Sequence, residues 1–248
     1  MDFAMLGIKY DRTQTFRKGA ARAPDMIRSM IPKTENFVAD VDLGEKAFIK
    51  DLGDIAPLER NQLINETFIK LSNEKAFPII LGGEHTISYA VAKVLKPAVF
   101  VSFDAHPDLR DDNTHEGVTR RIGDLIGYDN IILHGVRCMS KEEHEFIHDK
   151  KIKIMSVGDL KWLREPVYLS IDLDVLDPSI LPAVGNPEPD GLRFAQVLEG
   201  IKALAPNLVA IDFVEYTPFV NQNNDVNTAI VTKLINAAMA EIIKAKQL

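Results

Sequence analysis

Short, continuously apolar runs alternate with helix-patterned segments along most of the chain. Runs that are apolar at every position, rather than at every second one, are typical of strands covered on both faces. The predicted strands are Phe3–Ile8, Phe37–Leu43, Phe77–Leu81, Ala98–Phe103, Asn130–Leu133, Ile152–Ser156, Val167–Ile171 and Leu208–Phe213.

Helices are expected between these strands. Pro24 and Pro57 mark two helix starts, because proline suits the first helical turn. Ile64, Phe68 and Leu71 form an i, i+4, i+7 stripe that predicts the buried face of the second of these helices. The segment Asn224–Lys246 reads as a long closing helix.

This alternation of strand and helix implies parallel pairing with right-handed crossovers. We therefore predict an α/β fold, a three-layer α/β/α sandwich whose mainly parallel sheet has about eight strands. A TIM barrel is the alternative, and either architecture places a ligand site at the carboxyl ends of the strands. Because no repeat or Gly/Ser linker interrupts the chain, residues 1–248 are expected to form a single domain.

Composition narrows the functional class. A hydrophobic fraction of 46% and a charged fraction of 26% are those of an ordinary globular protein. The net charge of −7 argues against a nucleic-acid partner. The single Cys138 fits a reducing interior, and we expect it to be a small buried residue without a chemical role. Without a signal-peptide pattern at residues 1–8, or an apolar run longer than a strand, we expect a cytoplasmic protein that does not engage a membrane.

Two predicted strands end in side chains that commonly bind metals. Asp104, His106 and Asp108 follow one strand, and Asp172 and Asp174 close another. Side chains at i, i+2 and i+4 of an extended segment share a face, so each set should converge. Four aspartates crowded together raise one another's pKa steeply unless cations balance them. Two divalent ions would provide that balance.

A third predicted strand leads into Gly82-Gly83-Glu84-His85. These glycines permit positive φ and close backbone approach, which would aim His85 back across the strand ends. By itself this histidine could equally cap a helix or pack in the core. Beside the two aspartate-rich strand ends it becomes a candidate metal ligand.

Together these segments resemble the ureohydrolase family of arginases, agmatinases and their relatives, which hold a binuclear manganese centre. Gly82–His85 is similar to the family's Gly-Gly-Asp-His, and Asp104–Asp108 to its Asp-Ala-His-x-Asp. Ser170–Pro178 is similar to Ser-x-Asp-x-Asp-x-x-Asp-Pro, with Asp177 expected in a turn. The resemblance extends from Gly7 to the last helix.

The resemblance implies two Mn²⁺ ions per subunit. It implies one ion bound by His85, Asp104, Asp108 and Asp172, and another bound by His106, Asp104, Asp172 and Asp174. Two ions bridged in this way would lie roughly 3.5–4 Å apart and would make a hydroxide nucleophile from water near neutral pH. Mixed oxygen and nitrogen donors suit manganese better than zinc or magnesium.

Catalytic roles also follow from the resemblance. His115 occupies the position of the family's proton-transferring histidine, in an altered Thr114–Gly117 segment that has Glu116. Asp108 could accept a hydrogen bond from the hydroxide. Glu215, in a segment similar to Asp-x-x-Glu-x-x-Pro, would bind the guanidinium through charge-assisted hydrogen bonds. His134, His144 and His148 match no family position.

The expected partner is a small cationic guanidino substrate. Residues 7–28 resemble the opening of agmatinases, and residues 187–191 are similar to their Pro-Glu-Pro-Gly-Gly, with Asp190 as a departure. Asp111 and Asp112, just beyond Asp108, would favour the cationic tail of agmatine, although they could equally be a solvated charge run. Arg110, Arg120 and Arg121 could instead meet a carboxylate, which keeps arginase, guanidinobutyrase and formimidoylglutamase activities open.

Two other classes remain as alternatives. A metal-dependent phosphoryl-transfer enzyme would use the same aspartates but should also carry a phosphate-binding loop, which a lone glycine pair does not provide. A non-catalytic, metal-stabilised binding protein would not need His115 or Glu215. The family resemblance further implies a homo-oligomer, a trimer or a hexamer.

Overall fold

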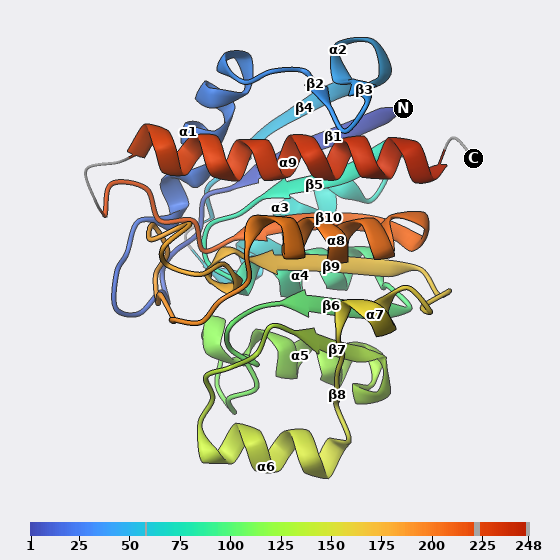
Figure 1. Ribbon diagram of the computed structural model, residues 1–248. Coiled ribbons are helices and arrows are strands. Elements are labelled where there is room, and N and C mark those ends of the chain that lie inside the picture. The colour runs from blue at the N-terminus through green and yellow to red at the C-terminus, as the bar shows by residue number, and fades with distance from the viewer. Residues whose placement is uncertain (58, 221–223, 247–248) are drawn as a thin grey trace.

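The computed structural model describes residues 1–57, 59–220 and 224–246. Its centre is an eight-stranded parallel sheet in the order β4-β1-β5-β10-β9-β6-β7-β8 (Figure 1). The strands are β1 (Asp2–Ile8), β4 (Phe48–Ile55), β5 (Phe77–Leu81), β6 (Val99–Phe103), β7 (Ile131–His134), β8 (Lys153–Ile154), β9 (Val167–Asp172) and β10 (Leu208–Val214). The sheet has two free edges, β4 and β8, so it is open and the barrel alternative is wrong.

Helices cover both faces of this sheet, as the alternating pattern predicted. The helices are α1 (Ala23–Met30), α2 (Leu43–Lys46), α3 (Arg60–Leu71), α4 (Thr86–Leu95), α5 (Val118–Ile126), α6 (Lys141–Lys150), α7 (Val157–Leu160), α8 (Phe194–Leu204) and α9 (Asn224–Lys246). Buried side chains of α1, α8 and α9 pack on one face, and those of α3, α4 and α5 on the other (Figure 1). The three-layer prediction is confirmed.

One predicted strand does not belong to the main sheet. The segment Phe37–Leu43 forms a small antiparallel hairpin outside the main sheet, made of β2 (Phe37–Val38) and β3 (Val41–Asp42). The eighth strand of the sheet is instead β4, which the apolar pattern missed. As an edge strand, β4 exposes most of its side chains and carries charges at Lys50, Asp51 and Asp54, so it lacks a continuous apolar run.

The helix signals were partly right. Pro24 lies in the first turn of α1, as predicted, but α3 begins at Arg60 rather than at Pro57. The buried residues of α3 are Leu63, Thr67 and Leu71, whereas Phe68 is 57% exposed. The predicted buried face of α3 is therefore wrong at two of its three residues, where the buried residue is the preceding one in the sequence.

The closing helix α9 has the predicted bounds. It is long and apolar enough to cross a membrane by length and composition, but 78% of its most apolar window is buried inside the protein. Ala238, Met239 and Ile242 pack into the core on the face shared with α1 and α8. Its apolar character is thus explained by its place in the core.

Candidate metal centre

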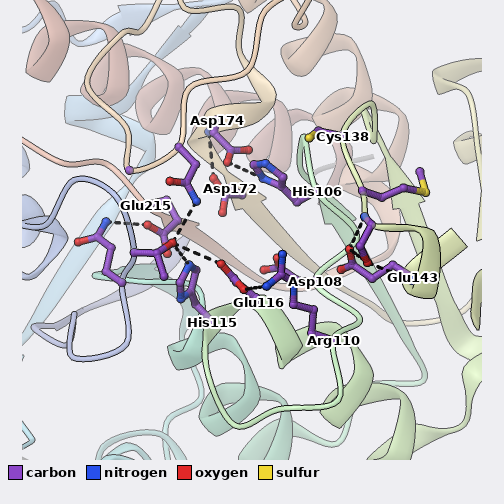
Figure 2. Close-up of a pocket in the computed structure, with 16 residues that line it drawn as sticks. His106, Asp108, Arg110, His115, Glu116, Cys138, Glu143, Asp172, Asp174 and Glu215 are labelled. Carbon is purple, nitrogen blue, oxygen red and sulfur yellow. Dashed lines mark hydrogen bonds and ion pairs between the residues drawn. The ribbon is translucent and has the colours of Figure 1, made fainter.

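Four neighbouring strands, β5, β10, β9 and β6, end at the same edge of the sheet and supply the site. Asp104 directly follows β6, Asp172 is the last residue of β9, and Glu215 directly follows β10. His85 immediately precedes α4, and Asp174 lies in the short 3-10 helix Leu173–Val175. The carboxyl ends of parallel strands thus bring these side chains together, and Figure 2 shows Asp172, Asp174 and Glu215 among them.

Two carboxylate residues of the site have unusual backbone conformations. Asp108 has a φ of 51° and Glu215 a φ of 62°, in the left-handed region that non-glycine residues rarely occupy. Gly82 and Gly83 are not among the described residues with positive φ, so they do not use this conformational freedom. Close approach is confirmed, because a Cβ on Gly83 would lie 2.0 Å from the carbonyl oxygen of Tyr10.

Both candidate histidine ligands face the aspartates through Nδ1. His85 Nδ1 lies 2.9 Å from Asp108 Oδ2, 3.2 Å from Asp104 Oδ2 and 3.6 Å from Asp172 Oδ2. His106 Nδ1 lies 3.0 Å from Asp174 Oδ2 and 3.6 Å from Asp104 Oδ1. The two oxygens of Asp104 therefore face one histidine each.

Burial and mutual repulsion disfavour the charged forms of three carboxyl groups in this cluster. Burial and the neighbouring Asp104 raise the pKa of Asp108 to about 6. Burial and the charges of Asp174 and Asp104 raise the pKa of Asp172 well above its usual value. Burial also raises the pKa of Asp104, but the nearby His106 and His85 imidazoles outweigh it, and the net pKa is low.

The donor set fits two divalent ions. Asp104 Oδ2 is buried and has no hydrogen-bond donor among the described residues, although His85 Nδ1 is near it. Ligand atoms of His85, Asp104 and Asp108 form one group within 4.8 Å of one another, and those of Asp104, His106 and Asp174 form another. Asp104 belongs to both groups, which suits a bridging carboxylate.

The other ring nitrogen of His85, Nε2, also has a hydrogen-bond partner. Its Nε2 lies 3.0 Å from Ser170 Oγ, and that hydroxyl donates to Asp212 Oδ1 over 2.6 Å. Ser88 and Tyr168 donate to the same buried carboxylate. Hydrogen bonds of this kind orient a histidine so that its other nitrogen can bind a metal.

A cavity of about 170 Å³ opens beside these residues. His106, Asp108, His115, Asp172, Asp174 and Glu215 all line it (Figure 2). Glu215 accepts a hydrogen bond from the backbone N–H of His85 over 2.8 Å, and burial raises the pKa of its carboxyl group to about 7. The structure therefore brings the candidate catalytic residues to the candidate metal ligands.

The arginines and acidic residues near the site are arranged differently from the prediction. Arg110 lines the cavity, but its guanidinium lies 2.7 Å from Glu116. Neither Arg120 nor Arg121 is among the lining residues. Asp111 is 3.2 Å from Arg120, and Asp112 accepts hydrogen bonds within its own turn at residue 114. Besides Glu215 and the candidate metal ligands, the acidic residues that line the cavity are Glu116 and Glu143.

Cys138 is half-buried and lines the cavity, so its placement as a core residue is wrong. Its Sγ forms a group within 4.8 Å with ligand atoms of His106 and Glu188. Asp177 accepts hydrogen bonds from Ser179 and Gly191, in agreement with the predicted turn.

The motif search missed several residues at the cavity. Gln14 and Thr15 come from the amino-terminal loop, and Gly185 and Asn186 from the loop before α8. These loops carry no metal-ligand spacing or strand pattern. The only signal for Gln14 and Thr15 was the likeness of residues 7–28 to the opening of agmatinases.

Comparison with known proteins decides the family. A model of the arginase family matches residues 1–241. The chain belongs to the arginase family. It is 40% identical over 224 residues to the N(1)-aminopropylagmatine ureohydrolase of Thermococcus kodakarensis, covering 82% of this chain and 77% of that protein. It is 36% identical to the agmatinase of Pyrococcus horikoshii, covering 82% and 78%.

Solved structures agree with this assignment. The agmatine ureohydrolase of Thermoplasma volcanium superposes with a TM-score of 0.88 at 31% identity, covering 99% of this chain and 91% of that one. The arginase family consists of metal-dependent hydrolases with binuclear centres. This arginase-family chain is accordingly a ureohydrolase, a hydrolase acting on amidino or guanidino groups.

Proposed function

We propose that this arginase-family enzyme hydrolyses agmatine to putrescine and urea, with two Mn²⁺ ions. One observation supports the choice of substrate. Arg110 is the only arginine or lysine among the described residues that line the cavity, and Glu116 pairs with it. An arginine substrate would need a cation in the cavity to bind its carboxylate. Agmatine has no carboxylate and needs no such cation.

His85, Asp104, His106, Asp108 and Asp174 would hold the ions, because their donor atoms form the two groups described above. Asp172, whose Oδ2 lies 3.6 Å from His85 Nδ1, would complete the set of ligands. When bound, two divalent ions supply a nucleophile at neutral pH by lowering the pKa of a water molecule. Asp108 lines the cavity beside them and would accept a hydrogen bond from that nucleophile.

The other steps belong to Glu215 and His115. The Glu215 carboxylate would bind the guanidinium and orient its central carbon for attack. Addition of water gives a tetrahedral carbon. Its bond to the alkylated nitrogen then breaks, leaving urea, and His115 donates the proton that the departing amine requires.

A second substrate is favoured by one comparison. The relative that is 40% identical is named for N(1)-aminopropylagmatine, which has a longer cationic chain than agmatine. Glu143 is a further carboxylate on the cavity wall, and a longer cation could reach it. Guanidinobutyrate, arginine and formiminoglutamate, which carry carboxylates, are the less favoured substrates.

We further propose that residues 1–248 act as one domain, in a cytoplasmic homo-oligomer of three or six chains. The single domain is supported by one continuous sheet built from both halves of the chain and by the match of one family model to residues 1–241.

The test is urea release by the manganese-loaded protein from agmatine, N(1)-aminopropylagmatine, arginine and guanidinobutyrate. Hydrolysis of formiminoglutamate, which yields no urea, is followed through its own product. We expect the largest kcat/KM with agmatine. Faster turnover of aminopropylagmatine would shift the assignment to the longer amine, and a preference for arginine would contradict the argument from the paired Arg110. Sedimentation would measure the oligomeric state.

A further inference from the structure

The loop between β1 and α1 connects the two catalytic side chains of the proposed reaction. Thr13 and Gln14 are consecutive in this loop, and each contacts a different functional residue. We propose that Gln14 positions Glu215 for the guanidinium and that Thr13 positions His115 for proton transfer. This inference rests on the proposed function.

Gln14 is 2% exposed and its amide is fully engaged. Its Oε1 accepts hydrogen bonds from the backbone N–H groups of Gly19, over 3.0 Å, and Ala20, over 3.3 Å. Because these donors fix the orientation of the amide, its NH₂ group must face the other way. There Nε2 donates to Glu215 Oε2 over 2.8 Å.

The Glu215 carboxylate is thus held by one donor on each oxygen. The backbone N–H of His85 binds Oε1, and Gln14 binds Oε2. A buried carboxylate fixed at both oxygens keeps its remaining lone pairs in one orientation, ready for a planar guanidinium. Without Gln14, the side chain could rotate about its terminal bond and lose that orientation.

Thr13 holds the backbone of His115 in position through a similar set of hydrogen bonds. Its backbone N–H donates to Glu84 Oε2 over 2.7 Å, and its hydroxyl donates to Glu84 Oε1 over 2.5 Å. Glu84 is fully buried, so the hydroxyl hydrogen is committed to it. The hydroxyl oxygen then accepts the backbone N–H of His115 over 3.0 Å.

Glu84 links this contact to the metal centre. Glu84 lies next to His85, just after β5. Hydrogen bonds from His115 to Thr13 and from Thr13 to Glu84 therefore connect His115 to the end of β5. Thr15 adds a weaker contact, with Oγ1 3.4 Å from His115 Nε2. The loop therefore sets the distance between the proton donor and the anchored substrate, which the geometry of attack requires.

The two roles predict changes in different kinetic constants, KM for Gln14 and kcat for Thr13. Gln14→Leu removes a hydrogen bond to a charged group, so KM for agmatine should rise about tenfold or more, with kcat within about twofold. Thr13→Val displaces the proton donor, so kcat should fall about tenfold with KM within about twofold. Thr13→Ser keeps the hydroxyl and should restore kcat. Lys18→Ala, in an exposed position of the same loop, is the control.

A binding measurement separates positioning from general damage. Calorimetry of the metal-loaded proteins with methylguanidine should show about tenfold weaker binding for Gln14→Leu and unchanged binding for Thr13→Val. All variants should retain the metal content and unfolding temperature of the wild type. A parallel change of KM and kcat in both variants, or unchanged methylguanidine binding by Gln14→Leu, would overturn the inference.

The inference and the proposed function fail separately. A wild-type enzyme that prefers another guanidino compound removes the agmatine assignment, and the same kinetic split is then expected with that compound. A wild type that releases no urea at all removes the proposed reaction. The binding of methylguanidine still decides the role of Gln14.

Discussion

Asp108 and Glu215 show how single residues at the site are held in an unfavourable conformation. A non-glycine residue in the left-handed region costs on the order of 1–3 kcal/mol. The backbone around each compensates, because the Asp108 carbonyl accepts hydrogen bonds from the N–H groups of Thr119 and Arg120, and the Glu215 N–H donates to Gly83. The turns thereby direct both carboxylates into the cavity.

Cys138 gives the first residue-scale prediction. As the only cysteine in the chain and a residue of the cavity wall, it can be labelled without ambiguity. Treatment with N-ethylmaleimide should inhibit the wild-type enzyme, because the adduct would fill part of a cavity of about 170 Å³. Cys138→Ala should keep urea release within about threefold of wild type, since proposed catalysis does not use the thiol.

Substrate protection provides the control for this experiment. Agmatine at saturating concentration should slow inactivation of the wild type, and mass spectrometry should find one adduct per chain. Inhibition that persists in Cys138→Ala would show that the reagent acts elsewhere. Loss of activity in Cys138→Ala itself would assign the thiol a role that the proposed mechanism lacks.

Among the secondary-structure elements, the strands that are buried on both faces were predicted correctly from the sequence. The strands β5, β6, β9 and β10 are apolar at nearly every position because helices cover both of their faces, and their ends carry the ligand motifs. The edge strand β4 has few buried positions, so its pattern resembles a loop. Gln14 and Thr13 were missed because their contacts with Glu215 and His115 join residues more than 100 positions apart.

The amino terminus of α6 supports the loop that carries Asp108. Ser140 and Glu143 form a capping box, and Glu143 Oε1 also accepts the backbone N–H of Leu109 over 3.1 Å. We expect Ser140→Ala to lower the free energy of unfolding by about 1 kcal/mol and to spare activity. Glu143→Ala should lower both stability and kcat, because it also frees the segment next to Asp108.

The capping box of α7 offers matched controls. At the start of that helix the backbone N–H and the hydroxyl of Ser156 donate to the Asp159 carboxylate, and neither residue lines the cavity. Ser156→Ala and Asp159→Ala should therefore reduce stability in chemical denaturation and leave kcat unchanged. If Glu143→Ala reduced only stability, the contact with Leu109 would have no bearing on catalysis.

For the whole molecule, the metal centre is a source of repulsion that metal binding relieves. The chain carries a formal charge of −7, and four aspartates lie together in its interior. Removing metal leaves these carboxylates to raise one another's pKa. Folding must then bury carboxylates whose charge only the neighbouring His85 and His106 imidazoles can balance in part, which costs free energy. Metal-free protein should accordingly unfold at a lower temperature than the loaded protein.

Asp172→Asn tests this account, because Asp172 is buried among the other carboxylates and its pKa is raised well above normal. Manganese at 100 times its Kd should stabilise the wild type by about 2.7 kcal/mol for each ion bound. The variant should gain much less, since a proposed bridging ligand is gone. Without metal, however, it should be at least as stable as wild type, because one buried charge has been removed.

Differential scanning calorimetry of both proteins, with and without manganese, measures these four states. Asp111→Asn is the control, because Asp111 is an exposed acid whose partner is Arg120. It should change neither metal-free stability nor the gain on adding manganese. A metal-free Asp172→Asn protein that is less stable than the wild type would mean that Asp172 contributes to the fold itself. An undiminished gain from manganese would remove Asp172 from the proposed ligands.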